Sequence, residues 1–201
     1  EARSWIAQCD GNGIDENLAL RLYSARLLGQ DRDLVLHGGG NASLKRYLAD
    51  PLGDEQAVLF IKGSGWDMAR LEAAGLPAVR LAPLQRLRSL SALDDLSMVN
   101  LLRGNLLDTQ APDPSVETLL HAFLPATFVD HTHASAILAL SDQPDGDGLC
   151  ADVFADVAAV VPYAMSGLAL AKAAAEAYHG QPDCRGLILA KHGLVSFGDT
   201  A

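Results

Sequence analysis

The sequence predicts an α/β fold in which helices cover both faces of a sheet. Short apolar runs that are typical of strands alternate along the whole chain with segments whose apolar residues recur at helical spacing. The apolar runs 186–190 and 194–197 are separated by a short turn that contains Gly193, which predicts a hairpin. We therefore expect a sheet that is at least partly antiparallel.

In the first half of the chain, helical spacing predicts helices and short apolar runs predict strands. The segment 14–28 carries Leu18, Leu22 and Leu28 at helical spacing and has two acidic residues in its first turn. The apolar run 34–36 is expected to be a strand that ends in a tight glycine turn. The remaining predictions are the turn at 37–43, helices at 66–74, 83–90 and 95–106, and strands at 57–61 and 77–81.

The second half of the chain continues this alternation. Pro114 suits the first turn of a helix at 114–124. Ser166 is expected to cap an alanine-rich helix at 166–178. The remaining predictions are strands at 127–133, 157–161, 186–190 and 194–197, a helix at 134–140 and a surface turn at 143–148.

Composition limits the functional classes. The chain has 201 residues, 49% hydrophobic and 20% charged, which is enough for a single globular domain over residues 1–201. No apolar run reaches the roughly 18 residues of a membrane span, and a net charge of -10 argues against nucleic-acid and anionic-membrane partners. Three widely spaced cysteines without a CxxC motif fit a reducing cytoplasm. The chain stops directly after a predicted strand, so we expect a domain truncated at its C-terminus.

Two histidines on one predicted strand are the strongest functional signal. His131 and His133 project from the same face of that strand, so both imidazoles can reach one small cation. His192, beside a glycine turn, is the expected third ligand. A pair at this spacing also arises by chance, but three protein ligands with an open fourth position are typical of a catalytic zinc site.

A carboxylate and a further histidine occupy the predicted helix 114–124. Glu117 is either an acid that complements the helix dipole on a solvated face or a general acid/base beside the metal. His121 follows four residues later on the same helical face, so it is a candidate partner of the metal site.

Two glycine-rich segments, 38–43 and 62–65, each follow an apolar run. Their small residues let backbone N–H groups converge on an anion, and Asn41, Ser43 and Ser64 add side-chain donors. The spacing fits neither a Walker motif nor a GxGxxG fingerprint. Each segment is therefore either a simple tight loop or part of a phosphate site.

Taken in chain order, five motifs resemble the zinc-dependent class II ketose-phosphate aldolase family, whose fold is shared with the adducin head domain. They lie at 40–43, 64–65, 115–117, 131–133 and 191–193. The amino-acid sequence is most similar to the aldolase domain of bifunctional rhamnulose-1-phosphate aldolase/alcohol dehydrogenases in the segments 36–41, 114–118 and 129–133. The resemblance implies a three-layer α/β/α sandwich with a mixed, largely antiparallel central sheet.

The resemblance also implies residue roles and a reaction. Zn2+ or another divalent metal would be held by His131, His133 and His192, with Glu117 as the acid/base. The substrate phosphate would be bound by Gly40, Asn41, Ser64, Gly65 and Ser115. The implied reaction is reversible cleavage of a ketose 1-phosphate, with rhamnulose 1-phosphate as the expected substrate, into dihydroxyacetone phosphate and an aldehyde through a zinc-stabilised enediolate. The implied partners are further copies of the chain, a tetramer among the candidates, and a short-chain dehydrogenase domain fused outside this chain.

Because the chain departs from the family pattern at several positions, the sequence does not determine which sugar is the substrate. Val116 stands where simple aldolases carry a second serine, Gly38 replaces a threonine, and the stretch 117–131 is shorter. The same framework also hosts sugar-phosphate epimerases, dehydratases and decarboxylases. Two further alternatives are a non-catalytic adducin-like scaffold and a metal-dependent hydrolase.

Overall fold

The computed structural model describes residues 1–200, and its centre is one mixed sheet of seven strands in the order β3-β2-β1-β4-β7-β6-β5. Only β5 and β6 pair in parallel, and every other neighbouring pair is antiparallel. The strands are β1 Asn41–Ala49, β2 Glu55–Ile61, β3 Ala78–Arg80, β4 Phe128–Thr132, β5 Ala158–Val161, β6 Gly186–Leu189 and β7 Gly193–Gly198. The predicted fold class is therefore confirmed, including the hairpin formed by β6 and β7.

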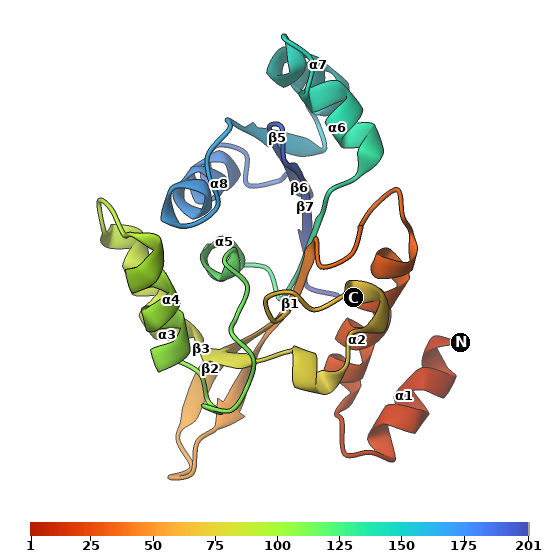
Figure 1. Ribbon diagram of the computed structural model, residues 1–201, viewed down its shortest axis with the longest axis vertical. Coiled ribbons are helices and arrows are strands. Elements are labelled where there is room, and N and C mark those ends of the chain that lie inside the picture. Colours follow the sequence, from red (N-terminus) through yellow and green to blue (C-terminus); the bar gives the residue numbers. More distant parts are fainter. Residues whose placement is uncertain (201) are drawn as a thin grey trace.

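Helices lie on both faces of this sheet (Figure 1). The helices are α1 Ala2–Asp10, α2 Glu16–Gln30, α3 Leu81–Arg86, α4 Asp95–Gly104, α5 Thr118–Phe123, α6 Ser135–Ser141, α7 Gly146–Phe154 and α8 Leu168–Gly180. Short 3-10 turns add η1 Met68–Arg70, η2 Ala73–Gly75 and η3 Leu87–Ser89. Within residues 1–200, none of the helices combines the length and the apolar character that a membrane crossing requires.

Alternating side chains divide the apolar core between the two faces. On β6, Leu187 and Leu189 join the large core under α3, α4, α5 and α8. Ile188, between them, packs with Ile137 of α6 and Cys150 of α7 on the opposite face. A third cluster under α2 includes Leu22 and lies near the other end of the sheet. The period of two along a strand thus produces the three layers.

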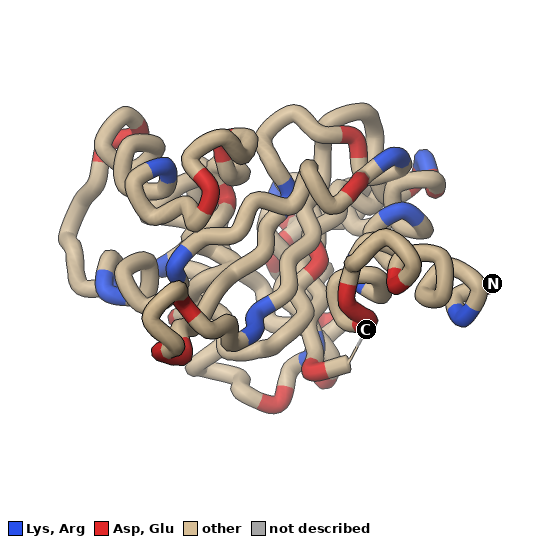
Figure 2. Tube along the Cα trace, turned by 90° about the horizontal axis from the view of Figure 1, so that it is seen from below, with Lys and Arg blue, Asp and Glu red and all other residues tan. Residues whose placement is uncertain are grey.

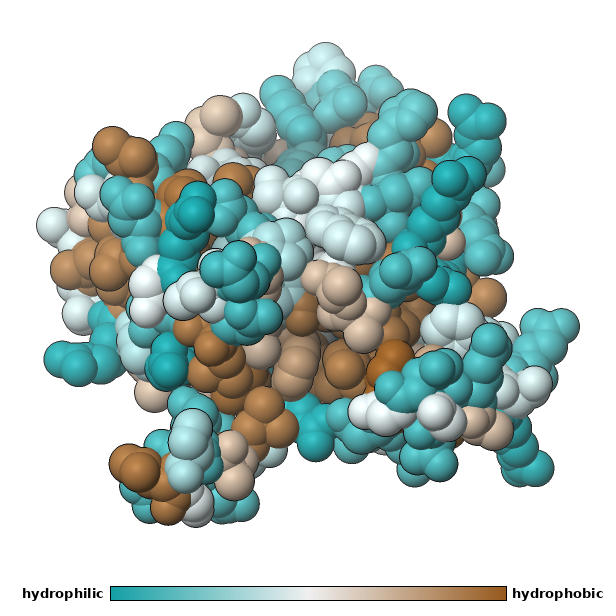
Figure 3. All heavy atoms as spheres, turned by 60° about the horizontal axis from the view of Figure 1, so that its bottom comes forward, coloured by the Kyte–Doolittle hydropathy of each residue, from teal (hydrophilic) through white to brown (hydrophobic). Residues whose placement is uncertain are grey.

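The surface of the domain is mixed in character. Acidic and basic residues are interspersed along the trace (Figure 2). Apolar atoms gather in a hollow near the centre of the face drawn in Figure 3, with polar side chains around them. Single large apolar side chains are also exposed, including Leu52 in the β1–β2 turn and Leu96 on α4.

The first glycine segment differs most from its prediction. Residues 34–36 form no strand: Val35 packs into the cluster under α2, which explains the apolar run. The predicted turn at 37–43 ends early, because β1 already begins at Asn41. Asn41 and Ser43 lie on the face of β1 that turns toward α5, where their side chains contact Glu117 and His121. These polar residues interrupt the apolar run by which a strand would be predicted.

Several other segments also differ from their predictions. The predicted helix 66–74 is replaced by η1 and η2. The predicted surface turn 143–148 runs into α7, because Gly146 allows close packing on α6: a Cβ there would lie 2.3 Å from the Ser141 carbonyl oxygen. Helix α1 was not predicted at all. Ser166 does not cap α8, whose N-cap is Gly167 without a side-chain bond.

Candidate active site

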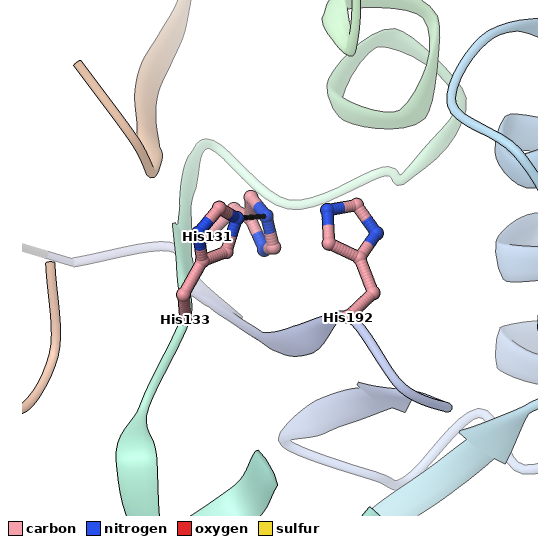
Figure 4. A group of neighbouring side chains, drawn as sticks. All are labelled: His131, His133 and His192. Atoms are coloured by element: carbon pink, nitrogen blue, oxygen red, sulfur yellow. Dashed lines mark hydrogen bonds between the residues drawn. The ribbon is translucent and has the colours of Figure 1, made fainter. Parts of the chain in front are cut away.

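Three histidines converge where β4 ends and the β6–β7 turn lies beside it (Figure 4). The imidazole Nε2 atoms of His131 and His133 are 3.1 Å apart, and the ligand atoms of His131, His133 and His192 all lie within 4.8 Å of one another. Two nitrogens about 2.0–2.1 Å from one tetrahedral zinc would be about 3.3 Å apart, so this spacing fits a shared ion. The shared-face geometry expected for His131 and His133 is what the structure shows.

The β6–β7 turn owes its position to two unusual backbone conformations. Lys191 has φ 57° and Gly193 has φ 158°, which turn the chain sharply around His192. A Cβ on Gly193 would lie 2.2 Å from the carbonyl oxygen of Thr132 on β4. Only glycine permits this close approach, and the approach brings the His192 ring to the rings of His131 and His133.

Burial favours the neutral form of the His131 and His133 imidazoles. Burial, the largest influence, lowers the pKa of His131 to about 4, and burial also lowers the pKa of His133. The Nδ1 of His131 lies 3.1 Å from the carbonyl oxygen of Leu194, which can only accept a hydrogen bond. The proton of His131 is therefore on Nδ1, and the Nε2 lone pair faces the other two rings, as a metal ligand requires.

Glu117 lies directly against these rings, just before α5. One carboxylate oxygen, Oε1, is 3.2 Å from Nε2 of His192, and Oε2 is 3.5 Å from Nε2 of His131. The side-chain amide of Asn41 donates to Oε2 at 2.5 Å, and the Ser166 hydroxyl donates to Oε1 at 3.2 Å. The structure therefore places the predicted acid/base beside the predicted metal ligands.

The charge of Glu117 follows from these surroundings. Burial raises its pKa, but the hydrogen bond from His192, and the positive charge that His131, His192 and His121 carry when protonated, lower the pKa to about 2. The carboxylate is therefore ionised at neutral pH. An ionised carboxylate beside three imidazoles is a donor set that suits a divalent cation.

The two glycine segments meet in one cavity of about 260 Å³. All five residues predicted to bind the phosphate line it, together with Glu117, His133 and His192: these five are Gly40, Asn41, Ser64, Gly65 and Ser115. A backbone hydrogen bond from Lys62 N–H to the Ala42 carbonyl joins the two segments. Two more bonds, from Ser64 N–H to the Asp113 carbonyl and from Ser115 N–H to the Lys62 carbonyl, join the second segment to the stretch that carries Ser115. The structure thus brings the two segments, far apart in sequence, into contact with the histidine cluster.

Lys62 is a cavity residue that the sequence reasoning missed. Its side chain is 2% exposed, and its ammonium donates to the carbonyl oxygens of Gly38 and Trp66 at 3.0 and 2.8 Å. Burial lowers the pKa of Lys62, while the charges of Glu117 and Asp67 raise it. It forms none of the ion pairs found in residues 1–200. In sequence it is only a lysine next to a glycine turn, so no signal singled it out.

His121 takes a place behind the cavity, away from the converging rings. It is fully buried, its Nδ1 lies 2.8 Å from the Ser43 hydroxyl, and its Nε2 has no partner among the described residues. Burial lowers the pKa of His121 well below its usual value. It is therefore a neutral residue beneath Glu117, and it is absent from the group of metal-binding candidates.

Comparisons with known proteins agree with this fold. The chain is similar to the N-terminal class II aldolase domain of a conserved protein from Thermoplasma acidophilum, with 37% identity, a TM-score of 0.84, and coverage of 90% of this chain and 83% of that one. The L-fuculose-1-phosphate aldolase of Thermus thermophilus shares the fold at 22% identity, with a TM-score of 0.55 and coverage of 90% and 81%.

A curated relative is much longer than this chain. The "uncharacterized oxidoreductase YuxG" of Bacillus subtilis strain 168 is 37% identical over 180 residues, which are 90% of this chain and 26% of that protein. This chain therefore spans about a quarter of that relative.

The mixed seven-stranded sheet and the site at its centre define a domain of the class II aldolase type. The chain belongs to the class II aldolase and adducin N-terminal domain family, whose model matches residues 21–201. The predicted family is therefore confirmed.

Proposed function

We propose that this domain is a metal-dependent aldolase that reversibly cleaves a ketose 1-phosphate, with rhamnulose 1-phosphate as the first candidate, into dihydroxyacetone phosphate and an aldehyde. One observation carries the proposal: the Glu117 carboxylate lies within 3.5 Å of two of three converging histidines and lines the same cavity as the glycine segments. An acid/base, a metal-binding cluster and an anion-binding wall are the parts that this reaction needs.

The metal would be held by His131, His133 and His192. A divalent ion held there would act as a Lewis acid that stabilises negative charge on the substrate. The donor set fits, because the Nδ1 proton of His131 is directed to the Leu194 carbonyl, and its Nε2 lies 3.1 Å from Nε2 of His133.

Glu117 would move the proton. In the condensation direction its carboxylate takes a proton from C3 of dihydroxyacetone phosphate, and in the cleavage direction its carboxyl group returns a proton to that carbon. The Asn41 amide and the Ser166 hydroxyl fix the direction of the carboxylate. An oriented base of this kind contributes about 10²–10⁴-fold to the rate.

The phosphate would lie against the glycine segments. Gly40, Asn41, Ser64, Gly65 and Ser115 line this wall, and the buried Lys62 ammonium makes it positive. A phosphate dianion would offset that buried charge. The protein as a whole is acidic, so the local charge is what would favour an anion here.

Metal analysis combined with an assay for dihydroxyacetone phosphate tests the proposal. The purified protein should contain about one zinc, or another divalent ion, per chain, and should release dihydroxyacetone phosphate from at least one member of a panel of ketose 1-phosphates. Epimerised, dehydrated or decarboxylated products would assign the same site to another reaction. Protein without stoichiometric metal and without turnover would support the adducin-like scaffold instead.

The assembly of the protein stays a prediction. We propose a homo-oligomer, with a tetramer as the candidate, and a short-chain dehydrogenase domain on the same polypeptide. Light scattering of the purified chain measures the first, and sequencing of the complete gene answers the second.

A further inference from the structure

Ser166 lies in the loop between β5 and α8 and turns into the active-site cavity. Its neighbours in this loop, Tyr163 and Met165, are exposed, whereas Ser166 lines the cavity. Gly167 follows with φ 122°, a conformation that favours glycine, and the chain then enters α8. The Ser166 hydroxyl is therefore free of a capping role, and it donates to Oε1 of Glu117 at 3.2 Å.

The Glu117 carboxylate has two kinds of neighbour. His131 and His192 approach it through their Nε2 atoms, and both rings belong to the cluster that would share the metal. Asn41 and Ser166 approach it from outside the histidine cluster, one on each oxygen. When the imidazole nitrogens bind an ion, their lone pairs are engaged and they offer the carboxylate no hydrogen bond. Asn41 and Ser166 are then the two donors that remain.

A carboxylate this close to three imidazoles is itself a good metal ligand. Zinc accepts carboxylate oxygen as well as imidazole nitrogen, at about 2.0–2.2 Å. Oε1 is 3.2 Å from Nε2 of His192, which is close to the spacing of two ligands of one zinc, so an ion in the cluster could take this oxygen as a ligand. A carboxylate bound to the metal cannot serve as a base, and its release must be favoured by something else.

We propose that Ser166 is a positioning residue whose hydrogen bond competes with the metal for Oε1 of Glu117 and thereby keeps the carboxylate available as a base. Asn41 provides the matching contact on Oε2. The inference rests on the proposed function, since it assigns Ser166 a part in the same site. It concerns a serine that the sequence alone places at a helix end.

Three variants and two measurements test this role. Ser166→Ala removes the hydroxyl, Ser166→Thr keeps it, and Met165→Leu is a matched control in the same loop. The first measurement is the exchange of the C3 proton of dihydroxyacetone phosphate with solvent. The second is the rate at which a chelator removes zinc from the protein, which does not depend on turnover.

The expected pattern separates positioning from folding. Ser166→Ala should lower the exchange kcat about tenfold, the effect of one hydrogen bond to a charged group, with little change in KM. Zinc release should become at least about threefold slower, because Glu117 then adds a ligand. Ser166→Thr and Met165→Leu should stay within about twofold of the wild type on both measurements. In a Glu117→Gln background, Ser166→Ala should no longer change zinc release.

Each of the other possible results contradicts either the positioning role of Ser166 or the proposed function. If the wild type binds zinc and exchanges the proton while Ser166→Ala matches it on both measurements, Ser166 has no positioning role. The same holds if Ser166→Thr is as impaired as Ser166→Ala, or if the effect on zinc release persists with Glu117→Gln. If the wild type neither binds zinc nor exchanges the proton, the proposed function fails and this inference fails with it.

Discussion

The two faces of β4 bury polar groups for different purposes. Asp130 points to the face covered by α2, where the terminal nitrogens of the buried Arg21 contact both of its carboxylate oxygens at 2.5 and 3.0 Å. His131 points to the opposite face, where its Nε2 meets other nitrogens and a carboxylate rather than a matched donor. Adjacent residues of one strand thus serve structure on one side and chemistry on the other.

Buried polar atoms without a partner occur on both faces. On the α2 side, Arg21 donates to the Ser43 carbonyl, which ties α2 to the sheet, while its own Nε has no partner among the described residues. On the other side, Asn41 Oδ1 and His121 Nε2 are buried without a partner among the described residues. Unpaired buried polar groups lower stability on either face, and those of Asn41 and His121 lie next to Glu117 and the cavity.

The largest effect should follow from removing a ligand histidine. His131→Ala, His133→Ala and His192→Ala should each abolish stoichiometric zinc, because two imidazoles alone bind an ion far more weakly than three. The proteins should still fold, since the back face is untouched. Elemental analysis of each variant measures this, with circular dichroism as the control. Unchanged zinc in all three variants would refute the metal site.

The carboxylate should be essential for proton transfer but not for the metal. Glu117→Gln keeps the shape of the side chain and can still accept from Asn41, but it cannot take a proton. We expect zinc content to stay near the wild-type value and C3 proton exchange to fall by about 10²–10⁴-fold. Isotope exchange into dihydroxyacetone phosphate measures the rate. A wild-type rate in this variant rules out the acid/base role.

On the back face, breaking the buried ion pair should affect stability instead. Arg21→Met leaves the partly buried Asp130 without its partner, which should lower the free energy of unfolding by about 3 kcal/mol, the lower end of the range for fully buried pairs. The double variant Arg21→Met with Asp130→Leu should recover most of that loss, because two apolar side chains replace two charges. Urea denaturation measures both. Folded Arg21→Met protein should keep its zinc, and loss of the metal would contradict the division between the faces.

The smallest effect concerns the start of α2, which covers the back face. Asp15 caps this helix by accepting hydrogen bonds from the backbone N–H groups of Asn17 and Leu18. Asp15→Ala should cost about 1 kcal/mol of stability, with zinc binding unchanged. Asp15→Asn is the matched control, because asparagine also caps well. An equal loss in both variants would show that the ion pair with Arg46 matters more than the cap.

The parts of the site that depend on local periodicity could be predicted from the sequence. The spacing of His131 and His133 on a strand and the hairpin that carries His192 were both readable, because they follow from backbone geometry over a few residues. The residues that depend on long-range packing were not. β1 was hidden because residues at its start are polar, and Gly146 looked like a turn although it permits two helices to touch.

Ser166 and Lys62 also could not be assigned to the site from the sequence alone. A serine before a glycine and an alanine-rich helix is typical of a helix cap, and only the approach of Glu117 to the β5–α8 loop gives it a different partner. Lys62 becomes a cavity residue only because the two glycine segments meet around its ammonium. Contacts of this kind join segments that the sequence separates widely, so no local pattern reports them.

The histidine cluster combines His131 of β4 and His133 just after it with His192 of a hairpin that is far away along the chain. β4 is itself flanked by β1 and β7. No helix can assemble these rings alone, and they meet only after the central antiparallel pairs have formed in register. Tight zinc uptake during refolding would therefore be a late event, timed by non-local strand pairing and not by the faster appearance of helical signal. The rate of tight zinc uptake would then report when the sheet is complete.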